Sequence, residues 1–379
     1  MSHDFVRQLP DSGLQTRRGT MRREILHLDL SMVFLILGIS SYGLVILYSA
    51  GGQHIDPVIS QSVKIVLATI AMVVAAQIPP VVYRRLAPWI FLAGLVTLVL
   101  VYFFGLEIKG SKRWFRIPGV INFQPSEMMK LMLPLILAWY FHDRHLPPKI
   151  RHVFWSLVFI AAPVLLIAIQ PDLGTSLIVG ASGLFVLLLT GIQWRTVFGV
   201  IGIGLASMPA LWSVMHDYQR QRILTLLNPE SDPLGAGWNI IQSKTAIGSG
   251  GLFGKGLFQG TQSHLDFLPE SQTDFIIAVL GEELGLSGVL LLLILYLLLV
   301  GRGVTLAVQA QDTFGRLVCG SITFTFFVYV FVNIGMVSGI LPIVGVPLPL
   351  VSFGGTSILT LFAGFGIMMS IHTHRRIAL

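Results

Sequence analysis

The sequence predicts an all-α polytopic membrane protein with about ten transmembrane helices. Its 379 residues are 54% hydrophobic and only 11% charged, which is far from the composition of soluble domains. Apolar stretches long enough to cross a bilayer recur along the whole chain, and basic residues gather in alternate loops. The predicted helices lie near residues 28-50, 58-78, 86-104, 125-141, 152-169, 174-191, 195-213, 274-300, 315-337 and 350-371.

The basic residues predict the orientation of these helices. The leader at 1-26 is basic and no small-residue cleavage site follows the first apolar run, which predicts an uncleaved first helix. Alternate loops continue the pattern with Arg84 and Arg85, Arg144, Lys149 and Arg151, Arg195, Arg302 and Arg316, and Arg375 and Arg376. The loops near 51-57, 170-173 and 338-349 contain no Lys or Arg.

By the positive-inside rule, both termini are therefore predicted to be cytoplasmic. The net charge of +7 is explained by topology, so no nucleic-acid partner is expected. The chain divides into a cytoplasmic leader, residues 1-26, and a single transmembrane domain, residues 27-379.

Two loops on the predicted outer side depart from this rule. The segment 105-124 contains Lys109, Lys112, Arg113 and Arg116, and the long segment 214-273 contains Arg220, Arg222, Lys244 and Lys255. These charges indicate either a site for an anion or solvated loops with incidental charge. The second segment, a large outer loop between helices 7 and 8, is too long for an ordinary connection. Its stretches 216-227 and 238-247 look amphipathic, which indicates interfacial helices.

Ionisable residues within the predicted spans are the sharper functional signal. Each costs about 2.5–3.5 kcal/mol at the centre of a span and so needs a partner or a watery cavity. Glu127 and Lys130 lie three residues apart at the start of the fourth helix, where they either neutralise each other or pair with a substrate. The other candidates are Lys64, Glu282 and Glu283.

Three further features have plain structural interpretations. Asp274 follows Ser271 by three residues and is predicted to open the eighth helix in a Ser-x-x-Asp capping arrangement. The stretch 341-355 is too rich in Pro and Gly for a continuous helix and is predicted to be a rigid outer turn that lines a cavity. The glycine-rich stretch 248-256 lacks the spacing of a phosphate loop and is interpreted as turn chemistry, so no nucleotide site is predicted.

No protein-built metal site is predicted. Cys319 is the single cysteine and lies in an apolar run. His372 and His374 lie at the end of the final helix beside two arginines, where an interfacial charge cluster is the simpler interpretation.

Several motifs occur in the order found in one known family. They are Gln124-Pro-Ser-Glu127 with Lys130, Gln170-Pro-Asp-Leu-Gly-Thr175, Tyr218-Gln-Arg-Gln-Arg222, Asn333, and Pro349-Leu-Val-Ser-Phe-Gly-Gly355. From about residue 24 onward the chain resembles the SEDS family of shape, elongation, division and sporulation proteins. It is most similar to the branch that acts in cell elongation and rod-shape maintenance.

The resemblance implies a peptidoglycan glycosyltransferase that polymerises lipid II at the outer face of the cytoplasmic (inner) membrane. It implies a class B penicillin-binding protein and other elongation-complex proteins as partners, with lipid II and lipid-linked glycan as substrates. The essential aspartate of the family corresponds to Asp274. Substrate contacts correspond to Arg113, Glu127, Lys130, Asp172 and Arg220.

The chemistry that this function requires matches these residue types. Asp274 would act as the base for the 4-hydroxyl of the GlcNAc of lipid II, with inversion at the anomeric carbon of the lipid-linked MurNAc, and the basic residues would hold the diphosphate. No organic cofactor is expected, whereas a divalent cation such as Mg²⁺ is compatible with the sequence. The alternatives are a lipid II flippase and a structural scaffold for a cell-wall synthase.

A stripe of small residues predicts where the partner helix packs. Ala278, Gly281, Gly285 and Gly288 share one face of the eighth helix and would permit close approach of another helix. We expect the eighth and ninth helices to form or support the contact with the partner's helix there, unless the stripe packs only against another helix of this chain.

Overall fold

A computed structural model of the chain describes residues 27–108, 111–117, 121–214, 220–221, 224–226, 228, 236–261 and 270–374. The predicted cytoplasmic leader, residues 1-26, lies outside the described residues. So do most of the predicted amphipathic stretch 216-227 and two of the outer-loop basic residues, Lys109 and Arg222.

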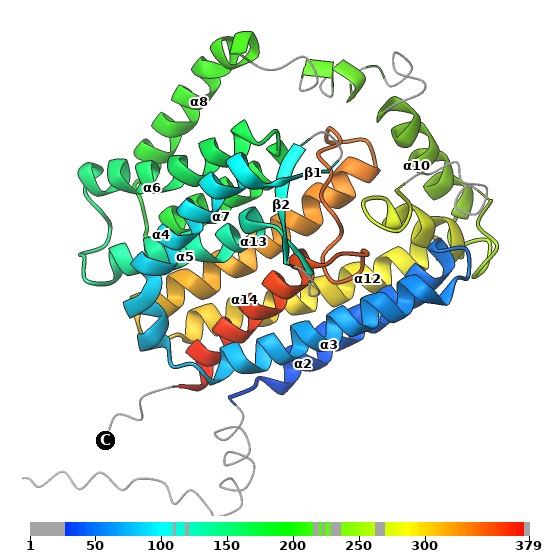
Figure 1. Cartoon of the computed structure of the whole chain (residues 1–379), viewed down its shortest axis with the longest axis horizontal. Coiled ribbons are helices and arrows are strands. Elements are labelled where there is room, and N and C mark those ends of the chain that lie inside the picture. Colours follow the sequence, from blue (N-terminus) through cyan, green and yellow to red (C-terminus); the bar gives the residue numbers. More distant parts are fainter. Residues whose placement is uncertain are drawn as a thin grey trace, which may run out of the picture.

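Helices occupy all ten of the predicted ranges (Figure 1). They are α2 (Leu30–Ala50), α3 (Ile55–Gln77), α4 (Pro80–Phe104), α5 (Pro125–His142), α6 (Ile150–Ile169), α7 (Leu173–Leu189), α8 (Trp194–Val214), α12 (Ile276–Gln309), α13 (Thr313–Val337) and α14 (Thr356–Thr373). Within the described part of the chain, seven of them are long and apolar enough to cross a membrane, and α7 is a shorter apolar helix. The predicted multi-pass helical membrane fold is confirmed, while the number of crossings stays a prediction.

Local sequence explains where several of these helices begin. Asp29, Asp172 and Asp312 precede α2, α7 and α13, and each carboxylate accepts the backbone N–H three residues later, at 2.9, 3.2 and 2.8 Å. Pro80 and Pro125 lie in the first turns of α4 and α5. Backbone N–H groups have no intrahelical acceptor there, so proline, which lacks the N–H, costs no hydrogen bond.

The two ends of the described chain lie together at one end of the bundle (Figure 1). The rings of His27 and His374 stack with centroids 3.8 Å apart, and Arg302 Nε donates to Asp29 Oδ1 at 3.1 Å. Burial, with the charge of His374 beside it, lowers the pKa of His27. This shared end agrees with an even number of crossings, although the side of the membrane stays a prediction.

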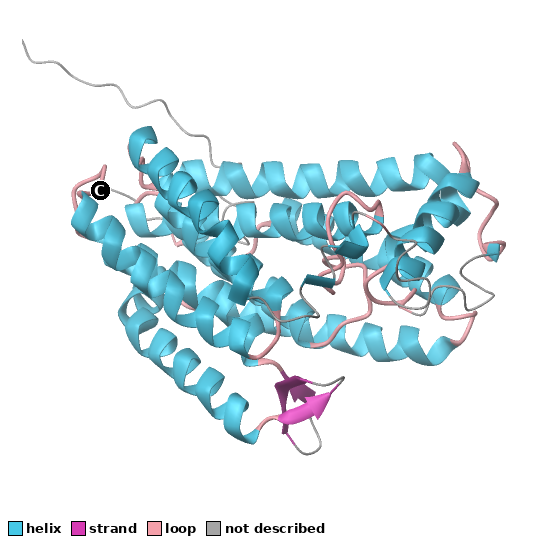
Figure 2. Cartoon of the chain, turned by 90° about the horizontal axis from the view of Figure 1, so that it is seen from above, coloured by secondary structure: helices cyan, strands magenta, loops and turns pink. Residues whose placement is uncertain are grey.

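A small sheet accompanies the helices, and the sequence analysis did not predict it. Strands β1 (Leu106–Ile108), β2 (Ser111–Ile117) and β3 (Ile121–Phe123) pair antiparallel in the order β1-β2-β3. The sheet lies at the edge of the bundle (Figure 2). Its strands are too short for a periodicity signal to stand out from the surrounding apolar sequence. The basic loop 105-124 is thus held by a β-ladder.

The long outer segment contains the predicted second helix, α10 (Ala236–Gly250). Ser243 Oγ donates to the carbonyl of Val337 at 2.9 Å, and Ile240 is buried, so α10 packs against the end of α13. The helix predicted at 238-247 is confirmed, and its interfacial position stays a prediction.

The glycine-rich stretch after α10 forms backbone hydrogen bonds to α12 where that helix is interrupted. Gly285 has φ 65° and ψ −160°, which interrupts the helix. The N–H groups of Lys255 and Gly256 donate to the carbonyls of residues 282 and 283 at 3.0 and 2.9 Å, and the N–H groups of residues 286 and 287 donate to the carbonyls of Gly251 and Leu252, both at 3.0 Å. The loop 251–256 therefore replaces the hydrogen bonds that the break removes.

An ion pair with one buried partner reinforces this junction. Lys255 Nζ lies 2.7 Å from Glu282 Oε1, and the same oxygen accepts the backbone N–H of Thr261 at 2.8 Å. Glu282 and Glu283 are fully buried, and Ser49 Oγ of α2 donates to Glu283. Glu282 and Glu283, two of the candidate charges within the predicted spans, therefore have a structural role beside the interruption of α12.

Close contact at Gly254 gives a prediction for stability. A Cβ there would lie 2.1 Å from the carbonyl oxygen of Glu283, at a φ of +79°. We expect Gly254→Ala to lower the thermal unfolding temperature of the purified protein strongly, since positive φ alone costs about 1–3 kcal/mol. Gly248→Ala is the matched control, because its Cβ meets nothing within 4 Å on helix α10. Equal unfolding temperatures for the two variants would contradict the role assigned to the loop.

The predicted partner-contact stripe proves to be packed within the chain. A Cβ at Gly281 would contact Ile247 of α10 at 3.3 Å, one at Gly285 would lie 2.3 Å from the N of Gly254, and one at Gly288 would lie 3.1 Å from the hydroxyl of Tyr42. Ala278 is fully buried. Small residues are needed here because α10, the loop 251–256 and α2 approach closely. The stripe thus packs within the chain, while the partner contact expected at the eighth and ninth helices stays a prediction.

Candidate functional site

A cavity of about 320 Å³ lies where several helices begin. The N-terminal ends of α5, α7 and α14, the turn before α12, and strand β2 all contribute to its wall. It is lined by Arg113, Trp114, Gln124, Glu127, Asp172, Thr175, Glu270, Thr273, Asp274, Tyr329, Gly345, Val346, Pro347, Phe353, Gly354, Gly355, Thr356 and Ser357. Converging helix N-termini make such a cavity favourable for anions.

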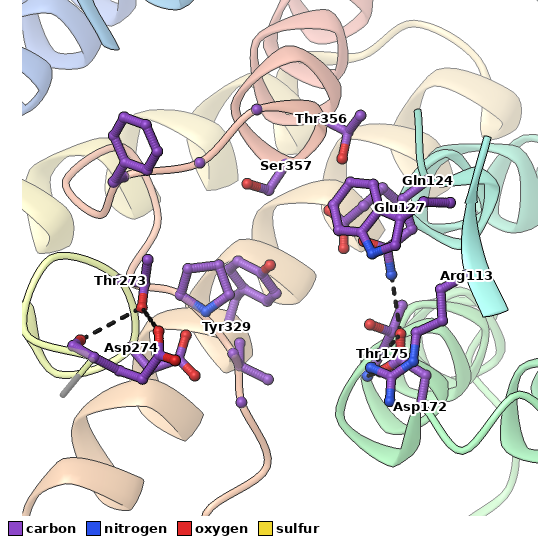
Figure 3. A pocket seen from close by; sticks show the side chains of 18 residues that line it. Arg113, Gln124, Glu127, Asp172, Thr175, Thr273, Asp274, Tyr329, Thr356 and Ser357 are labelled. Carbon is purple, nitrogen blue, oxygen red and sulfur yellow. Dashed lines mark hydrogen bonds and ion pairs between the residues drawn. The ribbon is translucent and has the colours of Figure 1, made fainter. Parts of the chain in front are cut away.

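Arg113 and Asp172 form one wall of the cavity (Figure 3). Arg113 Nη2 donates to the carbonyl of Pro171 at 2.7 Å, and its Nη1 lies 3.6 Å from Asp172 Oδ2. Gln124 Nε2 donates to the same carboxylate oxygen at 3.0 Å. Asp172 also caps α7, so its oxygens are occupied in holding Arg113 and Gln124 in place.

Arg113 has one buried donor that is not satisfied within the described chain. Its Nε is buried and has no hydrogen-bond partner within the described chain. A buried donor left without an acceptor costs about 1–3 kcal/mol. A ligand in the cavity would instead meet the accessible part of the Arg113 side chain, which is 28% exposed.

Glu127 and Lys130 form the predicted ion pair. Both are 6% exposed, and Lys130 Nζ lies 2.6 Å from Glu127 Oε1. Lys130 also donates to the hydroxyl of Tyr329 at 3.2 Å and lies 4.3 Å from the centroid of its ring. Glu127 and Tyr329 line the main cavity, whereas Lys130 lies beneath them.

Asp274 lies on the opposite side of the cavity from Arg113 and Asp172 (Figure 3). It is half-buried and precedes α12, whose N-cap residue is Phe275. Ser271 Oγ instead faces the carbonyl of Ala50 at 3.5 Å. The predicted Ser-x-x-Asp cap is therefore wrong, because the chain makes a turn before the helix begins.

The backbone around Asp274 is fixed at three successive carbonyls. Phe353 N donates to the carbonyl of Gln272 at 2.9 Å, Ser352 Oγ donates to that of Thr273, and Asn333 Nδ2 donates to that of Asp274 at 2.9 Å. Asn333 also donates to the carbonyl of Val346 at 2.6 Å. The Pro/Gly-rich turn thus lines a cavity, as predicted, and holds Asp274 in place.

The structure brings most of the predicted site residues together. Arg113, Glu127, Asp172 and Asp274 line the cavity, and Lys130 supports its floor. Arg220 is not among the lining residues and donates to the carbonyl of Ser213 at 2.9 Å. Its predicted substrate contact stays a prediction.

Sequence reasoning did not identify Tyr329, Thr356, Ser357 and Glu270 as site residues. Tyr329 lies in an aromatic-rich span, where a single tyrosine cannot be distinguished from a lipid-facing one by pattern. Thr356 and Ser357 follow the Gly-Gly pair of the turn 341-355 and are the first residues of α14. A hydroxyl pair at a predicted helix start beside such a turn is the signal that could have found them.

The cavity is not strongly cationic. Among the described residues that line it, Arg113 is the only Lys or Arg, against four carboxylates. Two of the carboxylates, Glu127 and Asp172, are in ion pairs, and Glu270 accepts a hydrogen bond from Thr273 at 2.7 Å. In the described ranges, no group of three or more His, Cys, Asp or Glu could hold a metal ion by itself.

Comparison with known proteins identifies the family. A family model described as "Cell cycle protein", covering FtsW, RodA and SpoVE, matches residues 24–377. The chain is 53% identical over 351 residues to the "Peptidoglycan glycosyltransferase MrdB" of Escherichia coli K12, with 92% of this chain and 95% of that protein covered. It is 35% identical to the "Probable peptidoglycan glycosyltransferase FtsW" of Geobacter metallireducens, with 93% and 97% covered.

Solved structures share the fold. One, described as "Structural coordination of polymerization and crosslinking by a peptidoglycan synthase complex", matches with a TM-score of 0.80 at 31% identity, over 91% of this chain and 97% of that one. Another, the rod shape determining protein RodA of Thermus thermophilus, matches with a TM-score of 0.70 at 29% identity, over 92% and 97%.

Proposed function

This chain belongs to the FtsW/RodA/SpoVE family of cell cycle proteins, the SEDS family, and we propose that it is a peptidoglycan glycosyltransferase that joins lipid II units into glycan strands during cell elongation. The observation that carries the proposal is the cavity in which Asp274 faces Arg113 and Asp172 across the starts of several helices. The relatives that are named peptidoglycan glycosyltransferases cover nearly the whole chain.

The cavity residues suit a single displacement. Asp274 removes the proton from the 4-hydroxyl of the GlcNAc of lipid II, and that oxygen forms a bond to C1 of the lipid-linked MurNAc. The bond from C1 to the diphosphate oxygen breaks, and the polyprenyl diphosphate leaves with the bonding electron pair. Attack from the face opposite the leaving group inverts the anomeric carbon.

The contacts of Arg113 and Asp172 suggest distinct roles for the two residues. Arg113 lines the cavity with a side chain that is 28% exposed, so we assign it the contact with the departing diphosphate. Asp172 is already bound to Arg113, Gln124 and the start of α7, so we assign it a positioning role rather than direct substrate contact. Glu127 and Lys130 support the floor below them.

This division of roles gives a kinetic prediction. We expect Arg113→Ala to raise the KM for lipid II by about tenfold, the loss for one charge-assisted hydrogen bond. Asp172→Asn should show a smaller rise, because the amide still accepts one hydrogen bond. Arg151→Ala, at an exposed position at the far end of the bundle, is the control. An unchanged KM in Arg113→Ala would remove this residue from the substrate site.

A divalent cation fits the lining residues only if carboxylates of the protein and phosphates of the substrate bind it together. Mg²⁺ commonly binds through one or two carboxylates together with substrate phosphates, and Glu270 and Asp274 both line the cavity. A cation there would neutralise charge on the departing diphosphate. No organic cofactor is required by the displacement.

The remaining assignments follow from the same function. We place the protein in the cytoplasmic (inner) membrane with the cavity facing outward, because lipid-linked peptidoglycan precursors are polymerised outside that membrane. A class B penicillin-binding protein and other elongation-complex proteins are the proposed partners. The similarity to a structure of polymerisation and crosslinking by a peptidoglycan synthase complex supports such a partner.

Polymerisation of lipid II tests the proposal directly. Purified protein, with its partner present and the partner's transpeptidase site blocked, should convert fluorescent lipid II into glycan strands visible on a gel. A flippase or a scaffold would produce none. Transport of lipid II across proteoliposomes without strand formation would favour the flippase and overturn the assignment.

A further inference from the structure

The described lining of the cavity carries little positive charge for the diphosphate that the proposed function requires. Among the described residues that line it, Arg113 is the only basic one, and a diphosphate presents several oxygens that need donors. A second source of positive charge near the cavity is therefore expected, and this reasoning rests on the proposed function.

Lys64 is a cation inside a membrane-spanning helix without a carboxylate partner. It is the tenth residue of α3, about 14 Å along the helix at 1.5 Å per residue. Its Nζ lies 3.6 Å from the centroid of the Phe353 ring, and the described residues place no carboxylate within 4 Å of it. Its neighbours Val63, Val66 and Leu67 are 53%, 58% and 45% exposed, so Lys64 lies at the edge of the membrane-facing surface.

Helix geometry directs this ammonium toward the cavity. Side chains on a helix lean toward its N-terminus, and the N-terminal part of α3 lies beside the turn that lines the cavity. Gln61 Nε2, one turn before Lys64, donates to the carbonyl of Ser352 at 3.1 Å, and Gly354 N donates to Gln61 Oε1 at 3.2 Å. Lys64 is therefore next to the cavity wall at Phe353, on its α3 side.

The adjoining start of α14 supplies unused donors. Its N-cap residue, Gly355, offers no side-chain cap, so the first N–H groups of the helix have no intrahelical partner. Thr356 is 4% exposed and lines the cavity, and its side chain makes no hydrogen bond within the described chain. Figure 3 shows Thr356 and Ser357 at the cavity edge, and a Cβ built on Gly355 meets nothing within 4 Å.

We infer that Lys64 and the start of α14 (Gly355, Thr356 and Ser357) form a binding subsite for the diphosphate of a membrane-anchored polyprenyl lipid. Phe353 stands between the two, because its side chain both lines the cavity and contacts the ammonium. We expect rotation of this ring to open Lys64 to the cavity. The position at the membrane-facing edge of α3 suits a ligand whose hydrocarbon chain stays in the bilayer.

Direct binding tests the subsite separately from catalysis. The full-length protein in nanodiscs of zwitterionic lipid is titrated with polyprenyl diphosphate by displacement of a fluorescent analogue. Lys64→Met should raise the Kd for polyprenyl diphosphate by about tenfold. Lys64→Arg should keep most of the affinity. Lys149→Met, an exposed lysine at the other end of the bundle, is the matched control and should bind as the unaltered protein does.

The outcomes separate the subsite from its rivals. A lower unfolding temperature with unchanged Kd in Lys64→Met would reduce Lys64 to a packing contact with Phe353 and overturn the inference. Equal displacement by phosphatidylglycerol or by inorganic diphosphate would also overturn it, because the site would then lack preference for a lipid-linked diphosphate. Lys64-dependent binding in a protein that forms no glycan would uphold the subsite while refuting the polymerase assignment.

Discussion

We expect Asp274→Asn to abolish glycan polymerisation while the protein still folds and binds its partner. Removing a general base costs about 10²- to 10⁴-fold in rate, and asparagine keeps the size of the side chain. The carbonyl of residue 274 still accepts from Asn333, so the turn before α12 is preserved. Gel analysis of fluorescent lipid II measures the rate, and thermal unfolding and co-purification measure folding and partner binding.

The control for this substitution is Asp143→Asn. The side chain of Asp143 is 91% exposed, it follows α5 at the end away from the cavity, and we expect full activity. Substantial polymerisation by Asp274→Asn or Asp274→Ala in the presence of the partner would show that the carboxylate is not the base. Lost activity with a normal Kd for polyprenyl diphosphate would agree with a role in the chemical step.

The second large effect is expected at the buried pair of Glu127 and Lys130. Lys130→Met leaves the carboxylate of Glu127, itself 6% exposed, without its partner at 2.6 Å. Breaking a buried ion pair from one side costs about 3–5 kcal/mol, so the unfolding temperature and the activity should both fall. Glu127→Gln should have a smaller effect on stability, because the hydroxyl of Tyr329 still contacts the ammonium.

The double variant Glu127→Gln with Lys130→Met separates structure from function. No uncompensated charge remains in it, so we expect the unfolding temperature to recover most of the loss. If polymerisation recovers as well, the pair serves only to support the cavity floor. If stability returns and polymerisation does not, one of the two residues contacts the substrate, and the KM for lipid II should be raised.

The sequence by itself determined the helical framework of this protein. Apolar stretches of spanning length place ten helices, because a bilayer requires each crossing segment to satisfy its own backbone hydrogen bonds and to be apolar. Ionisable residues inside those stretches, such as Glu127 and Lys130, were recognisable because their cost in a membrane demands an explanation. The ordered motifs then indicated the family, and Asp274 with it.

Only the tertiary structure decided how these residues meet. The contact of Arg113 with Asp172 links a β-strand to a helix start 59 residues later in the chain, and no local pattern predicts such an approach. The three carbonyls before α12 are held by Asn333 and the turn at Ser352 and Phe353, which corrected the expected helix cap at Asp274.

The glycines of α12 illustrate the same division. Their spacing on one helix face was evident in the sequence. The segments that pack against this face were not, because a small residue permits close approach by any neighbour. The structure places α10, the loop 251–256 and α2 against them, and this packing explains the small residues. Likewise, Lys64 was recognisable as a costly charge, whereas its position beside Phe353 depends on the packing of α3 along α14, a contact between segments almost 300 residues apart.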